Sequence, residues 1–125
     1  NELLRINELV EIVVKELTAH MKKEELILFP YIKQQVKALK EGVKAPTPHF
    51  GAVTSTISMM LDEHETAGDI FKEIANLSNN FTPPEEACNT FRALYSKLEE
   101  FEQDLHQHIH LENNILFPKA IQLEQ

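Results

Sequence analysis

Cysteine and glycine are scarce in this sequence, and long apolar runs are absent. The 125 residues include one cysteine, Cys88, and three glycines. One cysteine excludes a disulfide framework within the chain and fits a reducing compartment, so we expect a cytoplasmic protein. No apolar run approaches the ~20 residues that a membrane-spanning helix needs, and no signal peptide is visible. The few glycines, together with plentiful leucine, glutamate, lysine and alanine, favour helix.

Basic residues are also in the minority. The chain has 12 Lys and Arg against 20 Asp and Glu, which gives a net charge of −8. This charge argues against nucleic acid or an anionic membrane as a partner. Apolar residues make up 42% and charged residues 26% of the chain, values that are ordinary for a globular protein. A chain of this length builds one core, so we expect a single domain over residues 1–125.

The spacing of apolar residues predicts three long helices. In the first, apolar residues from Leu3 to Leu17 recur at alternating steps of three and four, which is typical of a helix facing a bundle core. We expect Pro30 to kink or break this helix, which then resumes to about Lys40 and ends near Gly42. Residues 43–50 hold two prolines and form a loop, and the second helix covers residues 51–77.

The third predicted helix follows the segment SNNFTPPEE and runs from about residue 83 to a break at Pro118. Thr82 would cap its N-terminus, with Pro83 at the first helical position and Glu85 completing a capping box. Cys88 adjoins a core position of this helix, so we expect it to be at least half-buried. The core positions that we assign to the second helix are Val53, Ile57, Met60, His64, Ala67, Phe71 and Ile74. Those of the third are Ala87, Phe91, Leu94, Leu98, Phe101, Leu105, His108, Glu112 and Ile115.

One motif occurs twice. HMKKEELILFP at residues 20–30 and HIHLENNILFP at residues 108–118 both fit the template H-x3-E-x3-L-F-P. The second copy lies within a cluster of three histidines. Only His108 falls on the core-facing stripe, because His106 and His110 are each about 200° away from it around a helix. We expect those two histidines to face solvent or the edge of the stripe.

Polar residues interrupt each apolar series. His20 and Glu24 continue the stripe of the first helix, which then reaches Ile27. The other interruptions are His64, His108 and Glu112. A buried carboxylate without a partner costs several kcal/mol, as an order of magnitude. A spacing of four residues puts a histidine and a glutamate on one helix face, and facing helices are ~8–10 Å apart. These five residues therefore predict a metal site inside a bundle.

The alternatives are structural. A single histidine on an apolar stripe is more often a satisfied core residue, and Leu-Phe-Pro is a helix stop with two core anchors. Five such residues on three helices, with a repeated template, favour the metal. Imidazole and carboxylate without thiolate suit iron or manganese and tolerate zinc. We interpret Glu63 as a solvated residue off the stripe, and His49 as a surface or capping residue.

Together with LDEHETAGDIF and SNNFTPPEEACNTFRALY, the two template copies resemble the hemerythrin-like domain of the repair-of-iron-centres (ScdA/YtfE-like) family. The resemblance implies an all-α, up-down four-helix bundle around an oxo- or hydroxo-bridged di-iron centre. His20 and His64 would ligate one iron and His108 the other, and Glu24 and Glu112 would bridge the two ions. It also implies a role in nitrosative and oxidative stress, with iron–sulfur proteins as clients.

The sequence departs from that family at its start. The first bundle helix of the family carries a further ligating histidine, and we find no such helix before the first predicted one. Either that helix is lost or disordered, or another chain, such as a second copy forming a homodimer, covers the site, or His49, His106 or His110 substitutes.

Two functions remain open at this point. The protein donates iron or acts on nitric oxide or reactive oxygen, or it is a hemerythrin-like module that binds or senses O2 or NO without turnover. A zinc-stabilised bundle is a third reading.

Overall fold

The computed structural model describes residues 2–44 and 53–124, and helices make up most of this part of the chain. Its helices are α1 (Glu2–Lys23), α2 (Phe29–Glu41), α3 (Val53–Leu77), α4 (Asn89–Leu111) and α5 (Phe117–Glu124). Two π-helical turns, η1 (Glu24–Leu28) and η2 (Glu112–Leu116), join α1 to α2 and α4 to α5. The described residues contain no strand, so the all-α prediction is confirmed.

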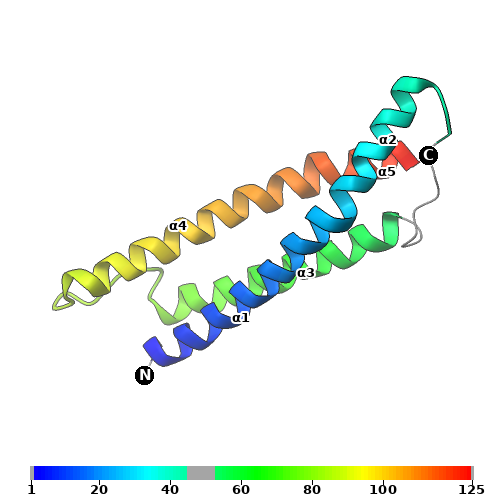
Figure 1. Cartoon of the computed structure of the whole chain (residues 1–125). Coiled ribbons are helices and arrows are strands. Elements are labelled where there is room, and N and C mark those ends of the chain that lie inside the picture. Colours follow the sequence, from blue (N-terminus) through cyan, green and yellow to red (C-terminus); the bar gives the residue numbers. More distant parts are fainter. Residues whose placement is uncertain (1, 45–52, 125) are drawn as a thin grey trace.

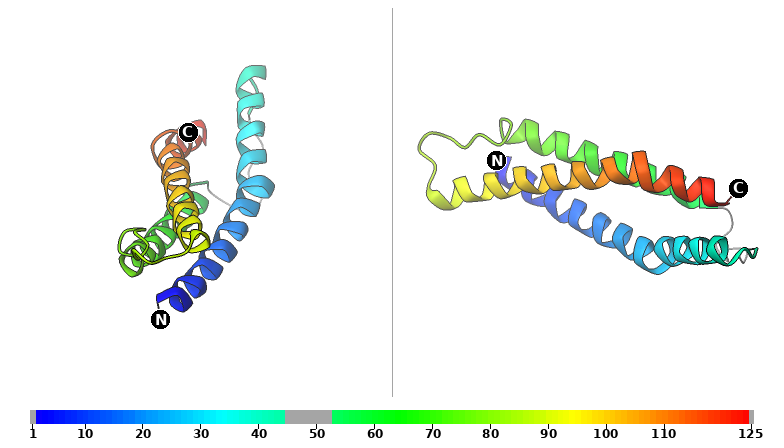
Figure 2. Two further views of the ribbon diagram at one scale, coloured as in Figure 1. Left: turned by 90° about the vertical axis from the view of Figure 1, so that its left-hand side faces the viewer. Right: turned by 90° about the horizontal axis from the view of Figure 1, so that it is seen from above.

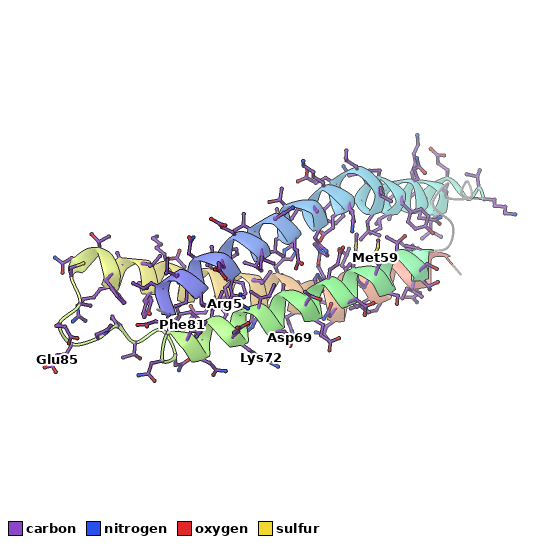
Figure 3. All side chains as sticks on the ribbon, turned by 90° about the horizontal axis from the view of Figure 1, so that it is seen from below. Arg5, Met59, Asp69, Lys72, Phe81 and Glu85 are labelled. Atoms are coloured by element: carbon purple, nitrogen blue, oxygen red, sulfur yellow. The ribbon has the colours of Figure 1, made fainter. Side chains whose placement is uncertain are left out.

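The helices form three rods that run up, down and up (Figure 1). The first rod is α1–η1–α2, the second is α3, and the third is α4–η2–α5. The first and third rods run in the same direction and α3 runs against them (Figure 1). α1 packs along α3, and α5 packs against both α2 and α3. At the exposed edge between α1 and α3, Arg5 Nη2 lies 3.3 Å from Glu73 Oε1 and forms a salt bridge between the two helices; Figure 3 labels Arg5. None of the described helices is long and apolar enough to cross a membrane.

The core consists of two apolar clusters with the predicted polar positions between them. The larger cluster lies nearer the start of α1 and contains the buried residues Ile6, Leu9, Val13, Ala67, Phe71, Ile74, Phe81, Tyr95, Leu98 and Leu105. The smaller cluster contains Leu28, Tyr31, Val53, Ile57, Met60, Phe117 and Ala120. On each rod, the predicted metal ligands fall between residues of the two clusters. The site is therefore closed above and below by apolar side chains.

Both template copies contain a π turn that the sequence did not reveal. The Phe29 N–H donates to the Glu24 carbonyl, and the Phe117 N–H donates to the Glu112 carbonyl, so each bond spans five residues. A proline one position later lacks an N–H, and its ring crowds the carbonyl four residues before it. The wider turn accommodates this ring without breaking the rod. The kink expected at Pro30 is confirmed as a bend, visible in the first rod in Figure 2, whereas the break expected at Pro118 is wrong because α5 continues the third rod to Glu124.

Beyond each π turn, the buried face of the rod lies one or two residues later than the regular period predicts. The stripe beyond Glu24 was expected at Ile27, but Leu28 is fully buried there instead. Beyond Glu112 it was expected at Ile115, which is 49% exposed, whereas Phe117 is 2% exposed. The regular 3.6-residue period fails at these points because one residue has been inserted into each helix.

The helix ends are defined by backbone geometry and by one arginine. α2 ends at Glu41, and Gly42 follows with φ 68°, a left-handed conformation that glycine adopts at low cost. α4 begins at Asn89 rather than near residue 83, so the predicted capping box at Thr82 is wrong. The Arg92 guanidinium donates to the carbonyls of Pro84, Glu85 and Ala87 and holds this segment outside the helix. Cys88, at the N-cap of α4, is exposed rather than half-buried.

The shifted face can be tested by alanine substitution in metal-free protein. We expect Phe117→Ala to lower the free energy of unfolding by about 3–5 kcal/mol, because it opens a cavity in the smaller cluster. We expect Ile115→Ala to lower it by less than about 1 kcal/mol, because that side chain is largely solvated. Urea unfolding with a chelator present measures both changes. A larger loss for Ile115→Ala would mean that the helix keeps an ordinary α register.

Candidate metal centre

The site is made where three rods reach the same level of the bundle. His20 lies in the last turn of α1, and Glu24 is the first residue of η1. His64 lies in the middle of α3, and Glu112 is the first residue of η2. Each of these four side chains is at most 4% exposed. The i, i+4 spacing within α1–η1 stacks His20 above Glu24, and the bundle brings the other two against them.

The four side chains converge on one small volume. One ligand atom from each lies within 4.8 Å of all the others. His20 Nε2 is 2.5 Å from Glu24 Oε1 and 3.6 Å from Glu112 Oε1. His64 Nε2 is 2.8 Å from Glu112 Oε1 and 3.2 Å from His20 Nε2. The structure therefore brings together four of the five residues that the sequence singled out.

The far nitrogen of each buried imidazole has its own partner. His20 Nδ1 is 2.7 Å from Glu63 Oε1, and the other oxygen of Glu63 is 2.5 Å from Lys23 Nζ. Lys23 Nζ also lies 4.0 Å from the sulfur of Met59, on the side of α3 that faces the first rod (Figure 3). His64 Nδ1 is 2.9 Å from Asn113 Oδ1. Since both partner atoms are oxygens that can accept, each histidine can donate from Nδ1 and direct Nε2 into the site.

With both imidazoles neutral and protonated on Nδ1, this arrangement collects acceptors with no donor between them. Two Nε2 lone pairs and the carboxylates of Glu24 and Glu112 then face one another in a buried space. Glu24 Oε1 and both oxygens of Glu112 have no properly directed hydrogen-bond donor. Buried acceptors and charges without partners are strongly unfavourable, so the cluster needs a positive charge at its centre. A metal cation with nitrogen and oxygen ligands satisfies all four groups at once, and the donor set fits such an ion.

The electrostatics of the metal-free site lead to the same conclusion. Burial alone would lower the pKa of His20, but hydrogen bonds to Glu112, Glu24 and Glu63 outweigh it and raise the pKa to about 10. Burial raises the pKa of Glu24, and the neighbouring Glu112 adds to this effect. Burial acts on Glu112 too, but hydrogen bonds to His20 and His64 hold its pKa well below its usual range. Without metal, a proton on His20 supplies the positive charge.

The remaining histidines are placed unequally. His108 reaches the edge of the site, with Nε2 at 3.2 Å from Glu112 Oε2 and 3.7 Å from Glu24 Oε1. Its side chain is 46% exposed, so it lies at the boundary with solvent rather than within the buried stripe. His106 and His110 are exposed, as expected from their angular positions. His49 lies outside the described residues.

Two residues of the site were missed in the sequence. Glu63, interpreted there as solvated, is half-buried and pairs with His20 and Lys23. Its carboxylate has a lowered pKa: burial opposes this, but the hydrogen bonds from Lys23 and His20 prevail. Asn113 was not singled out at all. Each residue directly adjoins a ligand candidate in sequence, and that adjacency is the signal that could have found them.

The raised pKa of His20 makes a prediction for the metal-free protein. Its folded value of about 10 exceeds the ordinary ~6.5 of an unfolded histidine. The folded state therefore holds this proton more tightly, and the resulting stability is fully present below pH ~6.5 and is lost as the pH rises through about 10. We expect the free energy of unfolding, measured by urea with a chelator present, to fall across this window. His20→Gln should lack this part of the fall, and identical profiles for the two proteins would contradict the assignment.

Comparison with known families agrees with this geometry. The family model described as the hemerythrin HHE cation binding domain matches residues 1–120. Among curated proteins, the chain is 48% identical over 112 residues to the iron-sulfur cluster repair protein YtfE of Pectobacterium atrosepticum, covering 90% of this chain and 45% of that protein. It is 47% identical over 107 residues to the YtfE protein of Escherichia coli O81, covering 86% of this chain and 43% of that protein.

The chain thus spans less than half the length of these relatives. The family match nevertheless covers nearly all of its residues and includes every member of the buried cluster. On this evidence, and on the all-helical architecture with a buried His/Glu cluster at its centre, the chain belongs to the hemerythrin family of HHE cation-binding domains.

Proposed function

We propose that the site holds a pair of iron ions and that the chain acts in the repair of iron–sulfur clusters under nitrosative or oxidative stress. In this proposal His20 and His64 ligate one ion and His108 the other, while Glu24 and Glu112 lie between the two. The observation that carries the proposal is the convergence of buried acceptors without a donor. The name of the similar proteins, iron-sulfur cluster repair, supports the activity.

In this proposal the three histidines differ in how firmly the protein holds them. His20 and His64 are buried and have partners on both ring nitrogens, so their Nε2 atoms are held in place. His108 is half-solvated and has contacts only to the two carboxylates, so it offers a weaker hold on its side. Bound iron would supply electrons and open ligand positions for small molecules. A loosely held second ion suits transfer of iron to a damaged client cluster.

An apolar pocket favours small uncharged ligands at the same end of the site. A pocket of about 310 Å³ reaches His108 and Glu112 and is bordered by Leu111, Ile115 and Leu116. NO and O2 are small and weakly solvated, so an apolar approach to the metal-binding side chains suits them. Such a pocket also fits the second candidate function, a hemerythrin-like module that binds or senses O2 or NO without turnover.

The cellular location, the domain organisation and the oligomeric state are further parts of this proposal. A single cysteine fits a cytoplasmic protein, and the two flanking core clusters fit one domain over the whole chain. Leu94, Leu111 and Ile115 are exposed apolar side chains on the third rod, and the last two lie one turn apart. A second copy of the chain, in a homodimer, would cover them.

Metal loading tests the ligand assignment. We expect anaerobic addition of Fe²⁺ to raise the free energy of unfolding, by about 2.7 kcal/mol when free metal is 100 times its dissociation constant. Glu24→Ala and Glu112→Ala should lose this gain and bind less iron by elemental analysis. Glu25→Ala, an exposed neighbour, should keep both. A metal-free structural bundle would instead show no iron-dependent gain, with the two core substitutions neutral or stabilising.

Reaction with nitric oxide separates the two candidate functions. We expect the iron-loaded protein to release N2O catalytically when mixed anaerobically with NO and an excess of a chemical reductant, or to transfer labelled iron to a client with a damaged cluster. A stable NO adduct in the absorption spectrum, with neither product nor iron transfer, would favour the binding module. One tightly held zinc and no iron in the purified protein would contradict both.

A further inference from the structure

Glu112 and Asn113, two consecutive residues of the third rod, contact the two ring nitrogens of His64. Glu112 Oε1 lies 2.8 Å from His64 Nε2, and Asn113 Oδ1 lies 2.9 Å from His64 Nδ1. In an α-helix, neighbouring side chains diverge by about 100° and do not face a common partner. Both residues belong to the π turn η2. The wider turn thus supplies the two contacts that a regular helix would direct apart.

A third residue from the same segment fixes the plane of this ring. Phe117 begins α5 directly after η2 and stacks on His64, with ring centroids 5.7 Å apart and an interplanar angle of 10°. His64 itself belongs to α3. The orientation of this histidine is therefore determined from the neighbouring rod, at its face and at both nitrogens.

The two template copies differ at the position that makes this contact. In the first copy, Glu24 is followed by Glu25, which is exposed. In the second copy, Glu112 is followed by Asn113, which is half-buried against His64. His20 has its Nδ1 partner on another helix, the carboxylate of Glu63, which Lys23 holds in place. One buried histidine is thus backed by a charged acceptor and the other by a neutral amide.

We infer that Asn113 is a positioning residue: its amide oxygen keeps His64 in the Nδ1–H tautomer, so that Nε2 presents a lone pair to a metal ion beside Glu112. The inference deepens the proposed metal-binding role and rests on it for its effect on affinity. Partners of this kind typically change metal affinity by about 10–100-fold when they are removed. The Nε2–H tautomer competes in metal-free protein, because its hydrogen would point directly at Glu112 Oε1. Without Asn113 that tautomer loses its competitor, and a metal must displace the Nε2 hydrogen before it can bind.

The tautomer can be read directly in metal-free protein. We expect nitrogen–proton correlation spectra, recorded where the ring is neutral, to show a larger share of the Nδ1–H form of His64 in the wild-type protein than in Asn113→Ala. Asn113→Ala should shift His64 toward the Nε2–H form, and Asn113→Asp should restore Nδ1–H because a carboxylate is a stronger acceptor. A wild-type spectrum with hydrogen on Nε2 alone would overturn the inference. So would an unchanged tautomer in Asn113→Ala.

Metal affinity supplies the second readout. We expect Asn113→Ala to weaken Co²⁺ and Zn²⁺ binding about 10–100-fold in competition with a chelator, and Asn113→Asp to recover it. Asn114 provides the matched control, since it is exposed and bonds to His110 on its own helix. Asn114→Ala should bind metal within about twofold of the wild type, and Asn114→Asp corrects for added charge. The unfolding of each metal-free variant shows whether it is folded, and Asn113→Ser replaces the alanine variant if that variant is not.

The outcomes separate the inference from the proposed function. If the wild-type protein binds no metal, the proposed function fails, and the tautomer spectra alone decide the role of Asn113. If the wild-type protein binds metal and Asn113→Ala binds it equally well, the inference fails and the proposed function stands. Failure of Asn113→Asp to restore either readout would reduce Asn113 to a packing residue and overturn the inference.

Discussion

The mutual repulsion of four buried acceptors is the constraint on which the rest of this molecule depends. Two imidazole lone pairs and two carboxylates meet in a space from which apolar clusters exclude water on both sides. In a medium of low polarity, such a meeting is tolerable only around a positive charge. A proton on His20 can serve in the metal-free protein, which accounts for the raised pKa of that histidine. A metal cation would serve better, because it would contact every acceptor at once.

The backbone brings the four acceptors together with the help of two π turns, one in each template copy. Each carboxylate is the first residue of a π turn, and each turn is followed by a proline. The same template therefore has two effects. It places histidine and glutamate one helical turn apart, and the π turn that starts at the glutamate changes which of the following residues face the core. This change directs Leu28 and Phe117 inward, where the smaller apolar cluster closes one end of the site. The two π turns fall at the same level of the bundle, since their first residues, Glu24 and Glu112, both lie close to His20 Nε2.

The sequence predicted most where helices are regular. All seven positions assigned to the core of the second helix are buried in α3, which no proline interrupts. Beyond each template copy the period fails, since nothing in the apolar pattern announces an inserted residue. The predicted start of α4 was wrong because the Thr-Pro pair has the sequence of a capping signal. The Arg92 hydrogen bonds that keep the preceding segment out of the helix come from a residue further along the chain, which the local pattern does not include. The buried acceptor cluster was anticipated from spacing, whereas Glu63 and Asn113 face neighbouring rods and depend on tertiary packing.

The position of the only cysteine has a practical consequence. Cys88 is exposed and lies at the N-terminal end of α4, twenty residues before His108, or roughly 30 Å along a helix. A nitroxide attached to this thiol would touch neither the ligand candidates nor the core clusters. A paramagnetic ion in the site would shorten the relaxation time of that label through space, so its distance could be followed by spectroscopy while metal is loaded and withdrawn. The same exposed sulfur would join purified chains in pairs under air, and a reductant is therefore needed whenever their natural association is measured.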